Sequence, residues 1–263
     1  MKTTRISPWI SVPLPNPEAC ARLICFPYAG AAAGIFHGWA YYLPSEIELW
    51  AVELPGRGSR VSEASFTSMP DLVDATAEAL APYLDLPFAF YGHSMGSMIA
   101  FELTRTLRNR YGIEPCRLVV SGRRAPHIPD TDPPSYNLPE AMLVEKLRRM
   151  NGTPREVLEH AEIMRLLVPI LRADFEVCQT YRYESGIPLS VPIDAYGGVE
   201  DDGETPDLLE EWGLHTTGEF SLQLLHGDHF FLHSAQEDLL KMLSEQMRQV
   251  VNHAKSSLCV SFA

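Results

Sequence analysis

Short apolar runs alternate along this chain with longer segments in which apolar residues recur at roughly a 3.6-residue period. This alternation is typical of strand-helix units around a mostly parallel sheet. The predicted strands are Arg22–Phe26, Leu49–Glu53, Phe88–Tyr91, Arg117–Val120, Val191–Tyr196 and Ser221–Leu225. The predicted helices are Phe36–Leu43, Met69–Leu84, Met95–Asn109 and Ala235–Val251. The pattern therefore predicts the α/β class, with a mostly parallel central sheet flanked by helices.

The stretch from Pro129 to Gly186 interrupts this alternation. It opens with a loop rich in proline and aspartate and continues with two or three amphipathic helices. Their apolar face is predicted to hold Leu143, Leu147, Met150, Ile163, Leu167, Ile170, Leu171 and Phe175. Such a face can cover the carboxyl edge of the sheet, where open α/β sheets bind ligands, although packing alone explains it equally well. We expect one domain, residues 1–263, with a helical lid inserted at about 129–186.

The composition argues against membrane, metal, cofactor and nucleic-acid partners. The N-terminal segment is interrupted by prolines and no apolar run is long enough to cross a bilayer, which predicts a cytoplasmic protein without a membrane partner. The five cysteines are scattered without metal-ligand spacing, so we expect reduced thiols, no metal and no organic cofactor. The net charge of -13 argues against a nucleic-acid partner, because phosphate binding needs a basic face. The local arginines Arg105, Arg108 and Arg110 fit a solvated helix face.

A candidate nucleophile stands where a predicted strand meets a predicted helix. The segment Gly92–Gly96 reads Gly-His-Ser-Met-Gly, and a serine in this setting typically occupies a strained turn that exposes its Oγ. The alternative is that the glycines only ease the turn. The N-terminus of the following helix would stabilise a developing oxyanion, so the N–H of Met95 is the first predicted donor. The second is the N–H of Ala29, after the first predicted strand, with that of Tyr28 as the alternative.

Ser94 needs an imidazole to accept its proton and a carboxylate to orient that imidazole. His229 is the best candidate base, because it follows a strand end and a glycine turn before the last helix. Three other histidines compete for the role. His226 is predicted to be a partly buried residue at the strand end, His233 to begin the last helix, and His93 to be a packing residue.

The acid is expected after the strand Val191–Tyr196, which gives the chain order Ser, Asp, His found in α/β-hydrolases. The loop that follows carries three carboxylates, those of Glu200, Asp201 and Asp202. Asp201 is our first choice, Asp202 the second and Glu200 the third. Spacing alone leaves the three open.

Five motifs together give the sequence a resemblance to a known family: Leu23-Ile-Cys-Phe-Pro-Tyr-Ala-Gly30, Glu53-Leu-Pro-Gly-Arg-Gly58, Tyr91-Gly-His-Ser-Met-Gly96, Ser121-Gly-Arg-Arg-Ala-Pro126 and Gly227-Asp-His-Phe-Phe231. Over nearly its whole length the chain resembles the stand-alone type II thioesterases of polyketide and non-ribosomal peptide biosynthesis. The resemblance implies an α/β-hydrolase fold. It also implies hydrolysis of acyl groups from the phosphopantetheine thiol of acyl or peptidyl carrier proteins, which clears mis-primed or stalled units.

The resemblance extends to the site. It implies Ser94 and His229, and the family pattern Gly-x-x-Asp, counted from Gly198, places the acid at Asp201. The family often has glycine where this chain has Asp228, so this residue is a further candidate to contact the imidazole.

The resemblance also separates editing enzymes from their relatives. Many chain-terminating thioesterase domains carry the acid directly after the strand that corresponds to Arg117–Val120. This chain has Ser-Gly-Arg-Arg there, which favours editing. Because carrier proteins are commonly acidic and this chain is acidic too, we expect a weak and brief encounter unless a local basic patch such as Arg123 and Arg124 offsets the repulsion. The alternatives are a carboxylesterase or lipase-like hydrolase of small esters, and a non-catalytic partner that binds carrier proteins.

Overall fold

The computed structural model describes residues 4–131 and 133–260, with side chains up to residue 252. Residue 132 in the predicted lid, and the side chain of Cys259, lie outside this description. In the described part of the chain, no helix is long and apolar enough to cross a membrane. The cytoplasmic location stays a prediction.

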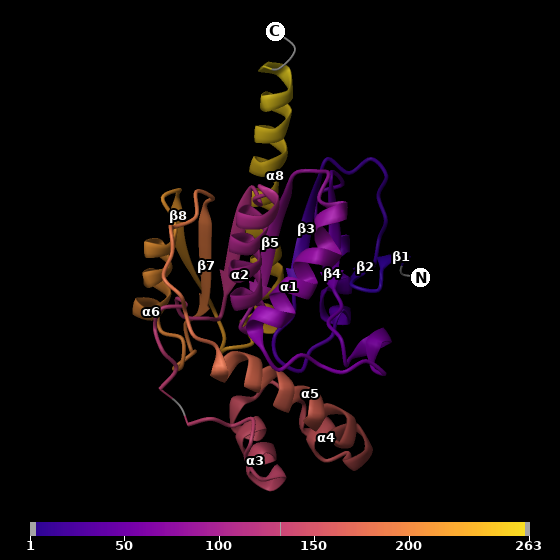
Figure 1. Cartoon of the computed structure of the whole chain (residues 1–263), viewed down its shortest axis with the longest axis vertical. Coiled ribbons are helices and arrows are strands. Elements are labelled where there is room, and N and C mark those ends of the chain that lie inside the picture. Colours follow the sequence, from indigo (N-terminus) through magenta and orange to yellow (C-terminus); the bar gives the residue numbers. More distant parts are fainter. Residues whose placement is uncertain (1–3, 132, 261–263) are drawn as a thin grey trace.

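An eight-stranded sheet forms the centre of the molecule, in the order β1-β2-β4-β3-β5-β6-β7-β8 (Figure 1). The strands are β1 (Thr4–Ser7), β2 (Ile10–Val12), β3 (Ala21–Phe26), β4 (Ile47–Val52), β5 (Phe88–His93), β6 (Arg117–Ser121), β7 (Ile193–Gly198) and β8 (Phe220–Leu225). All neighbours from β4 to β8 are parallel, whereas β1 and β2 add antiparallel pairs at one edge. The predicted fold class is thus confirmed.

Each of the six predicted strands overlaps an observed one, but the sequence pattern missed β1 and β2. These two strands have four and three residues, and β1 is largely exposed, so neither produces an apolar run. The central strands are buried on both faces, as is usual in parallel sheets. Alternate residues of β3 show this, because Ile24 and Phe26 belong to one apolar cluster and Leu23 and Cys25 to another.

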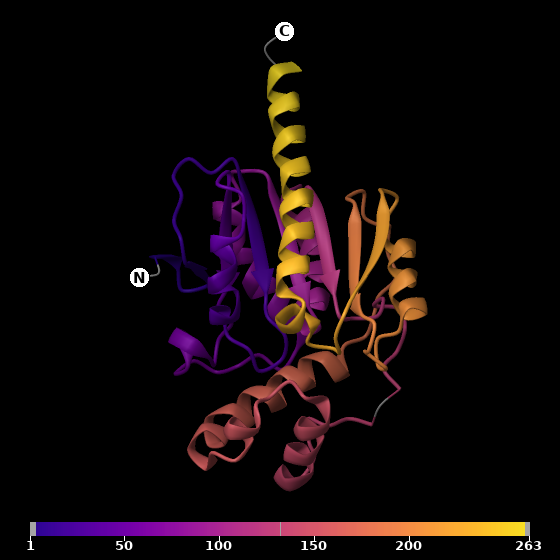
Figure 2. The same cartoon turned by 180° about the vertical axis from the view of Figure 1, so that it is seen from behind.

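Helices cover both faces of the sheet. α1 and α2 lie on one face and α8 on the other, as the two opposite views show (Figures 1 and 2). The α-helices are α1 (Met69–Leu80), α2 (Met95–Tyr111), α3 (Glu140–Met150), α4 (Arg155–Leu158), α5 (Ala161–Thr180), α6 (Pro206–Glu210), α7 (Phe231–Ser234) and α8 (Gln236–Val260). The 3-10 helices are η1 (Ala33–Tyr41), η2 (Gly58–Arg60), η3 (Ala81–Tyr83) and η4 (Glu211–His215).

Two predicted helices differ from the observed ones for local reasons. The segment predicted as a helix at Phe36–Leu43 forms the 3-10 helix η1 instead, since Gly34 and Gly38 weaken an α-helix there. The helix predicted over Met69–Leu84 ends at Leu80 and continues as a 3-10 turn, because a proline at position 82 has no N–H to donate.

Three helices, α3 to α5, lie between β6 and β7 in the chain and below the carboxyl ends of the strands (Figure 1). They fall within the predicted insertion at 129–186 and form their own apolar cluster, made of Leu143, Leu147, Leu158, Met164, Val168, Leu171 and Phe175. The predicted face is wrong at Met150 and Ile163, residues that are 38% and 42% exposed. Because α5 packs against α3 and α4, its buried row begins one residue later, at Met164.

The predicted solvated face of arginines on α2 is wrong at two positions. Arg105 donates to the carbonyl oxygen of Glu184, and Arg108 donates to those of Ile187 and Pro188. These bonds hold the chain that returns from α5 against the body of the molecule.

Candidate active site

Ser94 occupies the turn between β5 and α2 with a strained backbone, at φ 53° and ψ −113°. The turn is possible only because two neighbouring residues lack side chains. A Cβ on Gly92 would lie 2.1 Å from the carbonyl oxygen of Gly96, and a Cβ on Gly96 would lie 2.1 Å from that of Phe26. The N–H of Ser94 donates to the carbonyl oxygen of Ser121 at 2.7 Å, which fixes the turn against β6.

Met95 is the first residue of α2. The first N–H groups of a helix have no partner inside the helix and carry its positive end. This geometry leaves the N–H of Met95 beside Ser94 for a negatively charged oxygen.

The loop after β3 lies next to this turn. The N–H of Gly30 donates to a carboxylate oxygen of Asp174 at 2.7 Å, and that of Ala31 donates to the carbonyl oxygen of Tyr28 at 3.0 Å. Two N–H groups of the loop are therefore already engaged. Ala29 and Tyr28 line the same cavity as the serine, which keeps the N–H of Ala29 as the preferred second donor.

His229 and Asp201 are joined by a hydrogen bond of 2.7 Å between Nδ1 and Oδ2. The other carboxylate oxygen of Asp201 accepts the N–H groups of Gly203 at 3.0 Å and Glu204 at 3.1 Å. Burial by itself would raise the pKa of Asp201, but the imidazole and the two N–H groups outweigh it and hold that pKa below its usual value. The carboxylate therefore stays ionised and can orient the imidazole.

The competing carboxylates are arranged differently. Asp202 and Glu200 are exposed. Asp228 is committed elsewhere, since one of its oxygens accepts the N–H of Phe230 at 2.8 Å and the other accepts the side-chain amide of Asn151 at 2.9 Å. Of the four candidates, only Asp201 is hydrogen-bonded to the imidazole of His229 in the part of the chain that the structure describes.

The other histidines have identifiable roles. His93 is fully buried, with Nδ1 2.9 Å from Oγ of Ser121, and burial holds the pKa of its imidazole well below the usual value, so its predicted packing role is confirmed. His226 is exposed rather than partly buried, because β8 is the edge strand of the sheet. His233 lies inside the short α7 rather than at the start of the last helix, and its Nε2 is 3.0 Å from the hydroxyl of Tyr28.

The loops that carry the acid and the base touch through their backbones. A Cβ on Gly198 would lie 2.4 Å from the carbonyl oxygens of both Gly227 and Asp228. The N–H of Glu200 also donates to the carbonyl oxygen of Gly227 at 3.0 Å. This contact sets the separation between the carboxylate and the imidazole.

Arg123 and Arg124, the candidate basic patch, are both paired with carboxylates. Arg124 bonds Glu204 through its N–H at 2.7 Å and its Nε at 3.1 Å, and it also donates to the carbonyl oxygen of Gly203 at 2.7 Å. Nη1 of Arg123 lies 3.5 Å from the same carboxylate. Burial raises the pKa of Glu204 even though both guanidinium groups lower it. Because the N–H of Glu204 holds Asp201, these arginines brace the acid loop, a role that sequence analysis missed.

Ser94, His229 and Asp201 all line one cavity of about 410 Å³. Apolar side chains from the helices α3 and α5 close one side of it, among them Leu147 and Phe175. The cavity therefore combines a strained serine, an imidazole and a carboxylate with an apolar wall.

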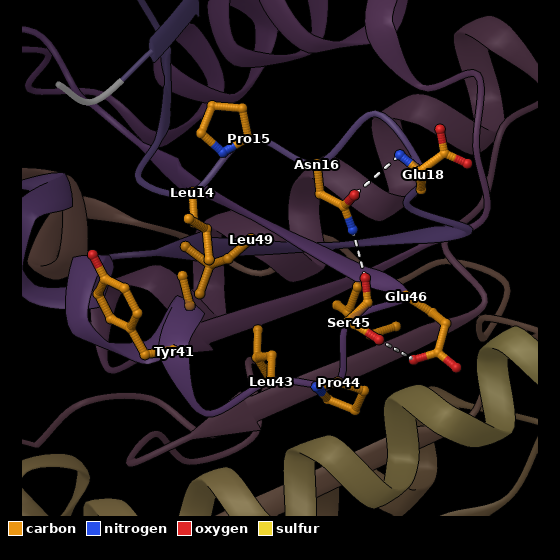
Figure 3. Close-up of a pocket in the computed structure, with 12 residues that line it drawn as sticks. Leu14, Pro15, Asn16, Glu18, Tyr41, Leu43, Pro44, Ser45, Glu46 and Leu49 are labelled. Carbon is orange, nitrogen blue, oxygen red and sulfur yellow. Dashed lines mark hydrogen bonds between the residues drawn. The ribbon is translucent and has the colours of Figure 1, made fainter. Parts of the chain in front are cut away.

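A second cavity, of about 620 Å³, lies near the starting ends of β3 and β4 (Figure 3). Its polar groups bond one another: Asn16 donates to the carbonyl oxygen of Ser45 and accepts the N–H of Glu18. Its described lining residues include no histidine and no cysteine, and the hydroxyl of Ser45 donates to the carboxylate of Glu46 at 3.3 Å.

Comparison with known proteins agrees with this geometry. The thioesterase domain family matches residues 21–247. The gramicidin S biosynthesis protein GrsT of Aneurinibacillus migulanus is 42% identical over 248 residues, covering 94% of this chain and 97% of that protein. The structure of the type II thioesterase BorB from the borrelidin biosynthetic cluster superimposes with a TM-score of 0.85 at 34% identity, covering 92% of this chain and 98% of BorB.

Another relative carries a different name. The linear gramicidin dehydrogenase LgrE of Brevibacillus parabrevis is 44% identical over 253 residues, covering 94% of this chain and 96% of that protein. Dinucleotide-binding dehydrogenases commonly use a Gly-x-Gly-x-x-Gly turn for the pyrophosphate, and this sequence contains no such segment. The unit formed by β5, a tight turn and α2 carries Ser94 in that turn instead, and this turn is called the elbow from here on. The chain belongs to the thioesterase family, and it is a type II thioesterase of the class found in non-ribosomal peptide and polyketide biosynthesis.

Proposed function

We propose that this enzyme hydrolyses acyl thioesters held on the phosphopantetheine arm of acyl or peptidyl carrier proteins, with Ser94 as nucleophile, His229 as base and Asp201 as the orienting acid. The observation that carries the proposal is the bond of 2.7 Å between the imidazole and the carboxylate, in the cavity that also exposes the strained serine. The names of the relatives, which refer to gramicidin S biosynthesis and to a borrelidin cluster, support this class of substrate.

In the proposed reaction, Oγ of Ser94 attacks the thioester carbonyl carbon while Nε2 of His229 takes the hydroxyl proton. The carbonyl oxygen becomes negative and accepts the N–H groups of Met95 and Ala29. The carbon-sulfur bond breaks, and the imidazolium returns its proton to the departing thiol. Water, activated by the same imidazole, then hydrolyses the acyl-enzyme, and Asp201 keeps the imidazole in the required tautomer throughout. These steps use no metal and no organic cofactor.

The position of the acid supports editing. The loop after β6, where chain-terminating relatives often hold their carboxylate, here supplies Arg123 and Arg124 to brace the loop after β7. This arrangement fits hydrolysis that clears stalled or mis-primed units.

We also propose that residues 129–186 act as a lid on a single domain. The turn between α3 and α4 lies over the loop that carries His229, called the histidine loop. Asn151 of this turn donates to Asp228, and a Cβ on Gly152 would lie 2.0 Å from the ring of Phe230. This turn is the lid edge nearest to the base, so its opening would admit the arm while the carrier protein stays outside.

Replacing Ser94→Ala should abolish hydrolysis without unfolding the protein, because Oγ contributes to the chemistry and little to packing. We expect kcat on an acylated carrier protein to fall by at least about 10³-fold, with an unchanged melting temperature. Labelling by a fluorophosphonate probe should disappear as well. A variant that keeps more than about a tenth of wild-type activity, equivalent to ~1.4 kcal/mol, would show that another group is the nucleophile.

The acid can be tested inside one loop. Asp201→Asn should lower kcat by about 10⁴-fold, because an amide no longer holds the imidazole in its working tautomer. Asp202→Asn is the matched control and should change kcat by less than about threefold, since its exposed carboxylate makes no bond to the imidazole. The reverse order would move the acid to Asp202, and two small losses would point to Asp228.

The brace on the acid loop predicts a change in pH dependence. Glu204→Gln removes the carboxylate that Arg123 and Arg124 share, which leaves more positive charge near Asp201 although Arg123 keeps Asp130 at 3.8 Å, and positive charge disfavours a protonated imidazole nearby. We expect kcat to fall by about tenfold and the acidic limb of the kcat/KM profile to move to lower pH. Asp207→Asn, at an exposed carboxylate on α6, should leave the profile in place. A profile unchanged in Glu204→Gln would contradict the brace.

The lid can be locked where it meets the histidine loop. In the double variant Asn151→Cys with Asp228→Cys, oxidation should tie the lid edge to that loop. We expect the oxidised protein to lose at least tenfold of its rate on an acylated carrier protein while it keeps its rate on a small-molecule acyl thioester. The same protein after reduction is the control and should turn over both. Equal rates before and after oxidation on both substrates would rule out gating at this edge.

A further inference from the structure

The lid helix α5 reaches the loop after β3 through one buried carboxylate. Asp174 lies on α5, is only 3% exposed, and accepts the N–H of Gly30 at 2.7 Å. Gly30 directly follows Ala29, the residue whose N–H is the proposed second oxyanion donor. A side chain of the lid thus fixes the peptide unit next to that donor.

A buried arginine completes this contact. Arg57 holds Asp174 with two parallel bonds of 2.5 and 2.7 Å, and it also donates to the carbonyl oxygen of Ala31 at 3.4 Å. Such a bidentate pair allows little rotation of either side chain. The pair therefore holds the loop on both sides of its turn, at the N–H of Gly30 and at the carbonyl of Ala31.

Apolar packing acts in the same direction. Gly30 has a φ of +82°, and a Cβ there would lie 2.6 Å from Cδ2 of Leu171. Leu171 stands one helical turn before Asp174, so both side chains lie on the same face of α5. The helix α5 thus contacts Gly30 in two ways, by the apolar packing of Leu171 and by the hydrogen bond to Asp174.

We propose that Asp174 is a positioning residue for the oxyanion hole. Acting through Gly30, it aims the N–H of Ala29 at the oxygen that becomes negative, so the hole is complete only while α5 stays docked. This proposal rests on the proposed function, since it takes the N–H of Ala29 as an oxyanion donor. The tetrahedral state should depend on Asp174, whereas binding of the uncharged thioester should not.

The test compares the two states in Asp174→Asn. An alkyl boronic acid gives the tetrahedral state: Oγ of Ser94 adds to boron, its proton passes to the imidazole, and a boronate oxygen occupies the oxyanion hole. We expect the variant to bind the boronic acid about 10- to 100-fold more weakly, with kcat on acyl carrier protein reduced in parallel and KM within twofold of wild type.

A second buried ion pair serves as the matched control. Asp194 on β7 pairs with Arg117 on β6 and is as deeply buried as Asp174, yet it touches neither the elbow nor the loop after β3. Asp194→Asn should lower the melting temperature to a similar extent and leave boronic acid affinity within twofold of wild type. If Asp194→Asn weakens the adduct as much as Asp174→Asn does, the effect is general loosening and the proposal is overturned.

A double variant covers the case in which Asp174→Asn does not fold. Arg57→Met with Asp174→Leu removes both charges together, so no unpaired charge stays buried, but Gly30 loses its acceptor. It should show the same weaker adduct with KM preserved. A folded double variant that binds the boronic acid as wild type does would overturn the proposal. A wild-type protein that fails to bind it, or a Ser94→Ala variant that binds it equally, would instead overturn the proposed function.

Discussion

The close backbone approach of β5, α2 and β3 around Ser94, at Gly92 and Gly96, is the constraint on which the rest of the site depends. A serine at φ 53° costs roughly 1–3 kcal/mol and persists only if its surroundings allow no other conformation. Gly92 and Gly96 allow the backbone segments to approach each other, and the buried hydroxyl of Ser97 holds them together. Oγ of Ser97 lies 2.8 Å from the carbonyl oxygen of Gly92 and accepts the N–H of Ser121 at 2.9 Å, which joins β5, α2 and β6 at one point.

The loops around that point are held mainly by buried charges. They lie at the carboxyl edge of the sheet, where apolar packing, such as that of Leu171 on Gly30, is joined by buried ion pairs. Glu204 with two arginines holds the acid loop, and Asp174 with Arg57 holds the loop after β3. Buried ion pairs of this kind add little net stability, because desolvation offsets most of the attraction, but they fix direction closely. These ion pairs therefore contribute mainly to the orientation of the two loops and little to the free energy of unfolding.

Local patterns explain what the sequence could predict. The parallel strands are continuous apolar runs, and the elbow is a contiguous segment, so both are visible without a structure. The bond between His229 and Asp201 follows from chain order and two short motifs, whereas the catalytic roles of these residues stay predictions. Arg57 and Asp174 are 117 positions apart in the sequence. The spacing of apolar and polar residues does not predict a contact over that distance. The same limit applies to Arg123, whose pairing with Glu204 depends on the fold and leaves no mark in the sequence pattern.

The pairing of Arg123 and Arg124 bears on the proposed encounter with a carrier protein. With both arginines paired to Glu204, an enzyme of net charge -13 would meet an acidic carrier protein without local attraction from this pair. Screening confines the repulsion to roughly 8 Å at physiological ionic strength, so the repulsion acts mainly once the two surfaces are close and weakens the encounter complex. Slow, brief encounters suit the proposed editing role, because a stalled acyl group persists long enough to be found while a productive intermediate is passed on. Discrimination would then come from how long the substrate waits as well as from the fit of the cavity to its acyl chain.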